Sequence, residues 1–210
     1  NGQLEMVEAL MGQRDRAGEV KVAGIEFHGS RKEIARLGVY GLPQEPLKNA
    51  CVARMSLAEN LALRNFDRPP LRRGIFLRRK PLMEQADRIV KQFRVKTPGL
   101  EARMSALSGG NVQRAVLGRE LNKDMKLLIA SNPTFGLDFM ACEETYKRIV
   151  DARNAGAGVL LISEDLDELI GLVDRLVVIN AGRIVYETPA DKADRLVIGK
   201  FMAGSHRSAA

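Results

Sequence analysis

The chain has 210 residues, of which 45% are hydrophobic and 28% are charged, with a formal net charge of +7. This composition is typical of a globular domain with at most a small subdomain, and it excludes collagen-like, intrinsically disordered and disulfide-scaffold proteins. The longest apolar runs, such as Val159–Ile162, are far shorter than the ~20 residues that a membrane-spanning helix needs.

The N-terminal quarter predicts a helix and two strands. Apolar residues recur at helical spacing over residues 3–11, which favours a helix. Residues 18–27 alternate in polarity, which predicts a short strand. A second strand is predicted over residues 38–42, and Pro43 ends it.

The middle of the chain, from about residue 55 to residue 103, contains no pattern that predicts a strand. A helix is predicted around residues 57–63, and a second helix presents Leu82, Ala86, Ile89, Val90 and Phe93 on one face. Between them lies the basic segment, residues 64–80, with seven basic residues and one acid, Asp67. We expect a solvated surface loop, which could also contact anionic lipid, with nucleic-acid binding as the alternative.

The last half alternates between helices and apolar strands, as in a parallel sheet covered on both faces. Helices are predicted over residues 111–121, 143–153 and 166–172, and strands over 127–130 and 159–162. A hairpin follows, in which residues 175–179 and 183–186 pair through the turn Asn180-Ala181-Gly182.

The most specific motif is Leu107-Ser108-Gly109-Gly110-Asn111-Val112-Gln113. Two glycines at the start of a helix let another molecule approach the backbone, and the free N–H groups and helix dipole there favour phosphate. The alternative is a serine-capped helix after a glycine turn, which is common.

Four further strings, in order along the chain, resemble those of ATP-binding cassette (ABC) ATPases, whose signature the Ser-Gly-Gly motif also resembles. Leu42-Pro43-Gln44-Glu45 is similar to the Q-loop, and residues 56–60 to the start of the family's helical subdomain. Residues 127–138 resemble the Walker B strand and D-loop, with Asp138 at the D-loop position. Residues 160–166 resemble the H-loop region.

The resemblance implies a RecA-like α/β ATPase core with a parallel sheet and an inserted all-helical signature subdomain. It divides the chain into residues 1–54, the N-terminal part of the core, residues 55–110, the helical signature subdomain, and residues 111–210, the C-terminal part of the core. The chain begins with Asn1-Gly2-Gln3-Leu4, which resembles the end of a Walker A loop, so most of that loop is missing and we expect a piece of a longer protein.

Five positions depart from the residues that hydrolysis by this family requires. Gln3 replaces the phosphate-binding Lys, Leu4 replaces the hydroxyl ligand of Mg²⁺, and Ser131 replaces the Asp of Walker B. Asn132 replaces the catalytic Glu and cannot accept a proton, and Glu164 replaces the His of the H-loop. Since positioned base catalysis alone contributes about 10²–10⁴ in rate, we expect no hydrolysis from this chain's own Walker motifs.

The spelling of the motifs resembles the tandem ATPase subunits of bacterial importers for simple sugars and nucleosides. The resemblance implies a degenerate C-terminal cassette at the cytoplasmic face of the membrane. Its Ser108, Gly109, Gly110, Asn111 and Gln113 would complete the site of Mg-ATP bound by the N-terminal cassette of the same polypeptide. The other implied partners are permease subunits and, indirectly, a solute-binding protein, with no nucleic acid. A stand-alone ABC ATPase, or one acting on DNA or RNA, is the alternative.

No metal site and no catalytic residue is expected in this chain. His28 and His206 lack a second His or Cys at ligand spacing. Cys51 and Cys142 form no Cys-x-x-Cys motif, and with no secretory signal they favour a reducing compartment. The acids Asp165, Asp167 and Glu168 are expected to begin a helix.

Overall fold

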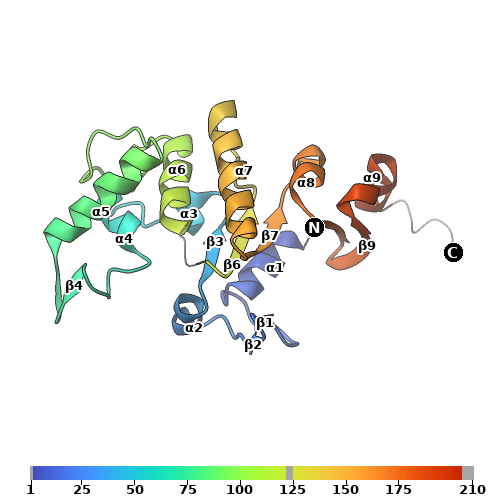
Figure 1. The fold of residues 1–210 in the computed structure, drawn as a ribbon, viewed down its shortest axis with the longest axis horizontal. Helices are drawn as coiled ribbons and strands as arrows, with labels where there is room; N and C mark the ends of the chain where they lie inside the picture. The colour runs from blue at the N-terminus through green and yellow to red at the C-terminus, as the bar shows by residue number, and fades with distance from the viewer. Residues whose placement is uncertain (1, 122–124, 205–210) are drawn as a thin grey trace. The chain divides into compact units, whose positions relative to one another are not determined.

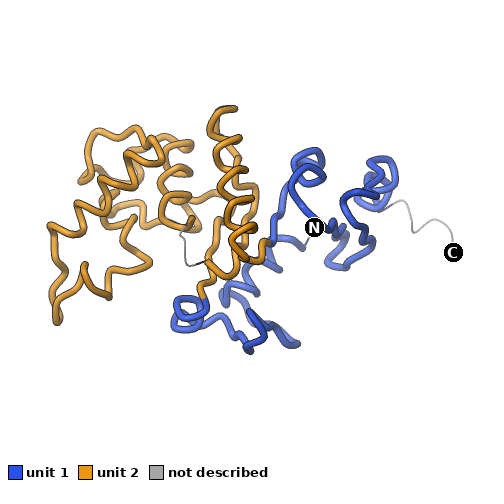
Figure 2. Tube along the Cα trace, in the orientation of Figure 1, with its two compact units in different colours: residues 1–37, 160–210 blue, residues 38–159 orange. Residues whose placement is uncertain are grey.

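The computed structural model describes residues 2–121 and 125–204. The chain divides into two compact units, one formed by residues 1–37 and 160–210 and the other by residues 38–159 (Figure 2). The positions Asn1 and His206, named above, lie outside the described residues.

A parallel pair of strands forms the centre of the unit 38–159. β3 (Val39–Leu42) pairs with β6 (Leu127–Ser131) in the register Val39↔Leu127 to Leu42↔Ala130. Val39, Leu42, Leu128, Ile129 and Ala130 are almost completely buried, as expected of strands that are covered on both faces. β7 (Gly158–Ile162) gives the sheet order β3-β6-β7, and the division between the two units falls within this strand. The predicted parallel sheet is confirmed.

Helices account for most of the remainder of this unit (Figure 1). Their bounds are α3 (Pro46–Asn49), α4 (Leu57–Ala62), α5 (Arg79–Gln92), the 3₁₀ turn η1 (Met104–Ala106), α6 (Gly109–Glu120) and α7 (Phe139–Asn154). α4 begins at a capping box, in which the Ser56 hydroxyl accepts from the Glu59 N–H and the Glu59 carboxylate accepts from the Ser56 N–H. α4, α5 and α6 pack against one another.

The basic segment differs from the loop that we expected. β4 (Arg72–Arg73) and β5 (Phe76–Leu77) form a short antiparallel hairpin, so the prediction that residues 55–103 contain no strand is wrong. Arg64 does not belong to the exposed basic surface either. Its guanidinium lies over the Tyr40 ring at 4.2 Å and its Nε is 3.4 Å from a carboxylate oxygen of buried Glu120.

The other unit contains α1 (Gln3–Leu10), a hairpin and a C-terminal layer. The stretch 18–27 forms two strands, β1 (Lys21–Val22) and β2 (Ile25–Glu26), instead of the single strand predicted, because Ala23 and Gly24 adopt positive φ and reverse the chain. The remaining elements of this unit are α2 (Arg31–Arg36), α8 (Leu166–Leu172), β8 (Arg175–Asn180), β9 (Arg183–Pro189), the 3₁₀ turn η2 (Ala190–Lys192) and α9 (Arg195–Met202).

The C-terminal layer has its own small core. The predicted hairpin is confirmed as β8 and β9, and α9 packs against it. Leu176, Val178 and Ile198 are buried, and the rings of Tyr186 and Phe201 stack at a centroid separation of 4.5 Å. Asp165 caps α8 by accepting from the N–H groups of Asp167 and Glu168, which confirms the expected role of these acids.

Candidate functional site: the start of α6 and the end of β6

The motif Ser108-Gly109-Gly110 forms the first turn of α6. Ser108 is exposed and does not cap the helix with its side chain. Its Oγ instead accepts from Nδ2 of Asn111 at 2.8 Å, and Oδ1 of Asn111 accepts from the Lys96 N–H at 2.7 Å. With no side-chain cap, the first N–H groups of α6 remain available at the positive end of the helix dipole, where an anion binds.

The second glycine of the motif lies against the segment that follows β6. A Cβ at Gly110 would come within 2.9 Å of the Gly136 carbonyl oxygen, so a larger residue would force these segments apart. Gly109 differs, because a Cβ there would meet no atom within 4 Å. Packing within the fold therefore requires glycine at position 110 but not at position 109.

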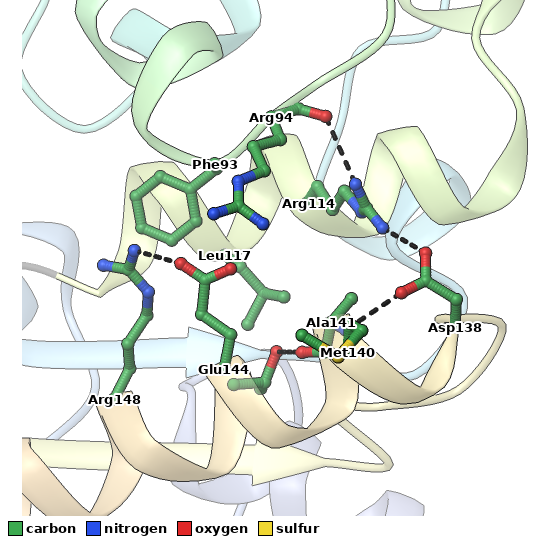
Figure 3. A pocket seen from close by; sticks show the side chains of 10 residues that line it. Phe93, Arg94, Arg114, Leu117, Asp138, Met140, Ala141, Glu144 and Arg148 are labelled. Carbon is green, nitrogen blue, oxygen red and sulfur yellow. Dashed lines mark hydrogen bonds and ion pairs between the residues drawn. The ribbon is translucent and has the colours of Figure 1, made fainter.

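Two side chains from the next positions of α6 hold the same segment. Gln113 is buried, and its Nε2 donates to the Pro133 carbonyl oxygen at 2.6 Å. Arg114 forms an ion pair with Asp138, whose other carboxylate oxygen accepts from the Ala141 N–H at 3.0 Å and caps α7 (Figure 3). The candidate signature residues and the candidate D-loop residue are thus joined within one unit.

A small pocket opens beside this ion pair, between α6 and α7 (Figure 3). Arg148 of α7 stacks over the ring of Phe93 at 4.2 Å and pairs with Glu144 at 2.7 Å. The pocket has a volume of about 50 Å³, which is enough for a few water molecules and too small for a nucleotide. Arg114 and Asp138 line it, so the pocket borders the ion pair of the candidate site.

The candidate Q-loop and Walker B positions lie at the carboxyl edge of the parallel strands. Gln44 follows β3, while Ser131 ends β6 and Asn132 comes next. Since Leu42 pairs with Ala130 in register, these three residues leave the sheet at the same edge, where open α/β sheets bind ligands. Asn132 adopts a φ of 45°, a left-handed conformation that Asn tolerates better than most residues.

The remaining candidate positions belong to the other unit. Gly2 precedes α1 with a φ of 103°, Gln3 is the first residue of that helix, and Leu4 is exposed. Glu164 is exposed between β7 and α8.

Sequence reasoning missed Arg114 and the exposed side chains of Phe139 and Met140 near Asp138, while Phe135 stands where the resembled family usually has Arg. Arg114 directly follows Gln113, and the signal that could have singled it out is its charge, which is opposite to that of Asp138. Phe135, Phe139 and Met140 are all strongly exposed, although each is a large hydrophobic residue. These three exposed apolar residues lie within six residues of sequence, on either side of Asp138.

Two structural findings apply to the described part of the chain alone. Within residues 2–121 and 125–204, no helix has the length and apolar character needed to cross a membrane. In the same ranges, no three His, Cys, Asp or Glu side chains gather closely enough to hold a metal ion.

Curated proteins with similar sequences are named as import ATP-binding proteins. A guanosine import ATP-binding protein from Bacillus subtilis and a nucleoside import ATP-binding protein from Lactococcus lactis subsp. cremoris are each 34% identical over 98% of this chain. A ribose import ATP-binding protein from Rubrobacter xylanophilus is 38% identical over 97% of it. The chain spans 41% of the length of each of these relatives.

Solved structures share the fold. A dimeric ATP-binding cassette bound to ADP and Pi matches with a TM-score of 0.71 at 18% identity, covering 89% of this chain and 79% of that one. An ATP-binding subunit of an ABC transporter matches with a TM-score of 0.75 at 18% identity, covering 96% and 83%. The family profile described as ABC transporter matches residues 5–135. The chain therefore belongs to the ABC transporter family, as an ATP-binding domain with the α/β cassette fold.

Proposed function

We propose that this chain is the degenerate second cassette of a tandem ATPase subunit that drives import of nucleosides or simple sugars. In this proposal it hydrolyses no ATP itself. It supplies Ser108, Gly109 and Gly110 to an ATP molecule held by the Walker motifs of the first cassette. The N–H groups at the start of α6 then face the γ-phosphate, where negative charge is greatest.

The observation that carries this proposal is the contrast between the start of α6 and the Walker positions. The start of α6 is exposed, uncapped and held by Gln113 and Arg114 against the segment that contains Asp138. The exposed apolar residues around Asp138, which are Phe135, Phe139 and Met140, support a protein partner on this surface. A domain that contacts its partner through this surface needs no hydrolytic site of its own.

The Walker positions lack the groups that hydrolysis needs. Gln3 carries no charge for the phosphates, Asn132 cannot act as a general base, and Glu164 places a negative charge where the family has His. Leu4 offers no ligand to Mg²⁺, and Ser131 offers a hydroxyl where the ion requires a carboxylate. These residues do not fit a magnesium site, and we assign the Mg²⁺ to the first cassette together with its ATP.

The tandem arrangement and the substrate class rest on the relatives. Import of guanosine, nucleosides and ribose is named for proteins of which this chain spans 41% of the length, a share that suits one of two cassettes on one polypeptide. We assign residues 1–54 and 111–210 to the ATPase core, with the Walker A loop incomplete, and residues 55–110 to its helical subdomain. Permease subunits are then the membrane partners, at the cytoplasmic face, and a solute-binding protein delivers the solute.

Reconstitution of the transporter with single substitutions in this cassette tests the proposal. Ser108→Arg should lower ATP turnover about a hundredfold, because a bulky cation blocks the approach of the partner's nucleotide to α6. Ser105→Arg, at an exposed serine in η1, is the matched control and should leave turnover unchanged. Gly109→Ala adds a smaller obstacle without a clash inside the fold and should lower turnover less. A Ser108→Arg transporter with normal turnover would overturn the proposal.

A further inference from the structure

The hairpin β4–β5 presents a row of apolar side chains to solvent between two groups of cations. Ile75, Phe76 and Leu77 are 85%, 71% and 49% exposed. The flanking cations, all exposed, are Arg72, Arg73, Arg78, Arg79 and Lys80. We call these residues, 72–80, the hairpin tip; they contain no acid, and within the described residues the acid paired with one of their cations is Glu101, the partner of Arg79.

The hairpin tip is anchored to the rest of its unit. Leu71, at the base of β4, is completely buried, and its carbonyl oxygen accepts from the Arg78 N–H at 2.7 Å. Gly74 has a φ of 61°, whereas the φ of Ile75 is not positive. This combination is typical of a hairpin turn with glycine at the first central position. The apolar side chains are therefore held outward by a closed turn.

Folding does not account for this arrangement. The turn places Ile75 at a position where polar residues are usual, and its side chain packs against almost nothing. α5 begins directly after the hairpin with Arg79 and Lys80 and has no acid in its first turn. Cations at the positive end of a helix dipole oppose helix formation, so these charges are kept at a cost in stability.

We propose that the hairpin tip binds an anionic lipid surface, with the apolar residues entering the headgroup layer and the cations pairing with lipid phosphates. Cations around a protruding apolar tip suit such a surface, because each part contacts the layer that matches it. Nucleic acid fits less well, since Phe76 is the one aromatic side chain of the tip and Ile75 and Leu77 offer neither stacking nor hydrogen bonds. For the basic segment, the structure thus favours lipid over the nucleic-acid alternative, and it removes Arg64 from the contact.

Sedimentation of the 210-residue chain with vesicles tests this proposal without nucleotide or a partner cassette, so its result is independent of the proposed function. The chain should bind vesicles of phosphatidylcholine mixed with phosphatidylglycerol, and not vesicles of phosphatidylcholine alone. Arg73→Gln with Arg78→Gln should weaken binding roughly thirtyfold, because each cation near an anionic surface contributes to the affinity and two are removed. Lys147→Gln with Lys200→Gln removes the same charge from exposed helical positions and should change binding little.

The apolar part of the contact has its own test. Ile75→Ser with Phe76→Ser should weaken binding at least tenfold. Ile184→Ser with Leu196→Ser, which removes two exposed apolar residues elsewhere, should have no effect. The chain contains no Trp, so Phe76→Trp introduces a single fluorescent reporter. Its emission should shift to shorter wavelength with anionic vesicles, whereas that of Ile184→Trp should not.

Four results would overturn the lipid assignment. The first is equal binding by the hairpin variants and their controls, and the second is an unchanged Trp emission at position 76. The third is a chain that binds no vesicles but binds duplex DNA with a steep salt dependence. The fourth is cross-linking from position 76 to a permease subunit alone.

Discussion

The side-chain Nε2 of Gln113 lies 2.6 Å from the carbonyl oxygen of Pro133, and this hydrogen bond joins the first turns of α6 to the segment that follows β6. Gln113 is 3% exposed, so water does not compete for the carbonyl. The ion pair between Arg114 and Asp138 makes a second link between the same two segments. The start of α6 and residues 133–138 are therefore held together by two side-chain interactions, and we expect a ligand that displaces one segment to displace the other.

Gln113→Ala should destabilise the chain by about 1–3 kcal/mol, because it leaves a buried carbonyl without its donor and opens a small cavity. Urea unfolding followed by circular dichroism measures the change. Gln44→Ala is the matched control, since Gln44 is exposed, and it should stay within about 0.5 kcal/mol of the original chain. Equal stability of Gln113→Ala and Gln44→Ala would contradict a structural role for the bond.

The elements predicted well from sequence are those with long periodic or continuous apolar patterns. α8, β6 and β7 lie within a few residues of their predicted bounds, and α5 contains most of the predicted apolar face, because periodic or continuous apolar residues mark these elements along the chain. α7 begins at Phe139, four residues before the predicted start, because its N-cap is Asp138 and the apolar pattern begins later. The short helices α2, α3 and α9 were not predicted.

Other features escaped because they depend on contacts distant in sequence. Arg64 lies among basic residues along the chain, yet Tyr40 and Glu120 draw it inward. The hairpin β4–β5 rests on two residues per strand, too few for an alternation to be recognised. The same holds at the candidate site, where the motif singled out Gln113 but no local pattern pairs Arg114 with Asp138.

The buried carboxylate of Glu120 is the basis of a second prediction. Its two oxygens lie 2.7 Å from Nε of Arg119 and 3.4 Å from Nε of Arg64, and Glu120 is 3% exposed. Glu120→Ala should destabilise the chain by about 3–5 kcal/mol, because it leaves buried guanidinium charge without its partner.

Urea unfolding of Glu120→Ala should show a midpoint far below that of Glu143→Ala, an exposed control on α7. A loss of less than about 1 kcal/mol in Glu120→Ala would mean that water or other carbonyls replace the carboxylate.

Acid should weaken the N-terminal part of the chain through Glu33. Hydrogen bonds from Ser30, first from its hydroxyl at 2.6 Å, and from His28 lower the pKa of Glu33 from 4.5 to about 2. A depressed folded-state pKa adds stability above the unfolded value, and this contribution is lost as the pH falls from about 4.5 to about 2.

Ser30→Ala should raise the pKa of Glu33 toward 4.5 and flatten the loss of stability over that range, as followed by NMR titration and by urea unfolding at several pH values. Ser105→Ala, at an exposed serine in η1, should leave both unchanged. A Glu33 pKa that stays near 2 in Ser30→Ala would assign the shift to His28 instead.

The last prediction concerns hydrolysis by the chain alone. The purified 210-residue chain should release phosphate from ATP no faster than its Ser108→Arg variant. Gln3 provides no positive charge for the phosphates, Ser131 provides no carboxylate ligand for the metal, and Asn132 provides no base.

Asn132→Glu restores the base yet should leave the chain inactive, since the other two groups are still missing. It should also destabilise the chain by roughly 1 kcal/mol, because position 132 has a φ of 45° that Glu tolerates less well than Asn. Asn132→Gly, which accepts this φ without strain, separates the backbone effect from the chemistry. A severalfold rise in phosphate release for Asn132→Glu over both the original chain and Asn132→Gly would mean that this domain holds its own Mg-ATP, and the assignment of a degenerate site would be wrong.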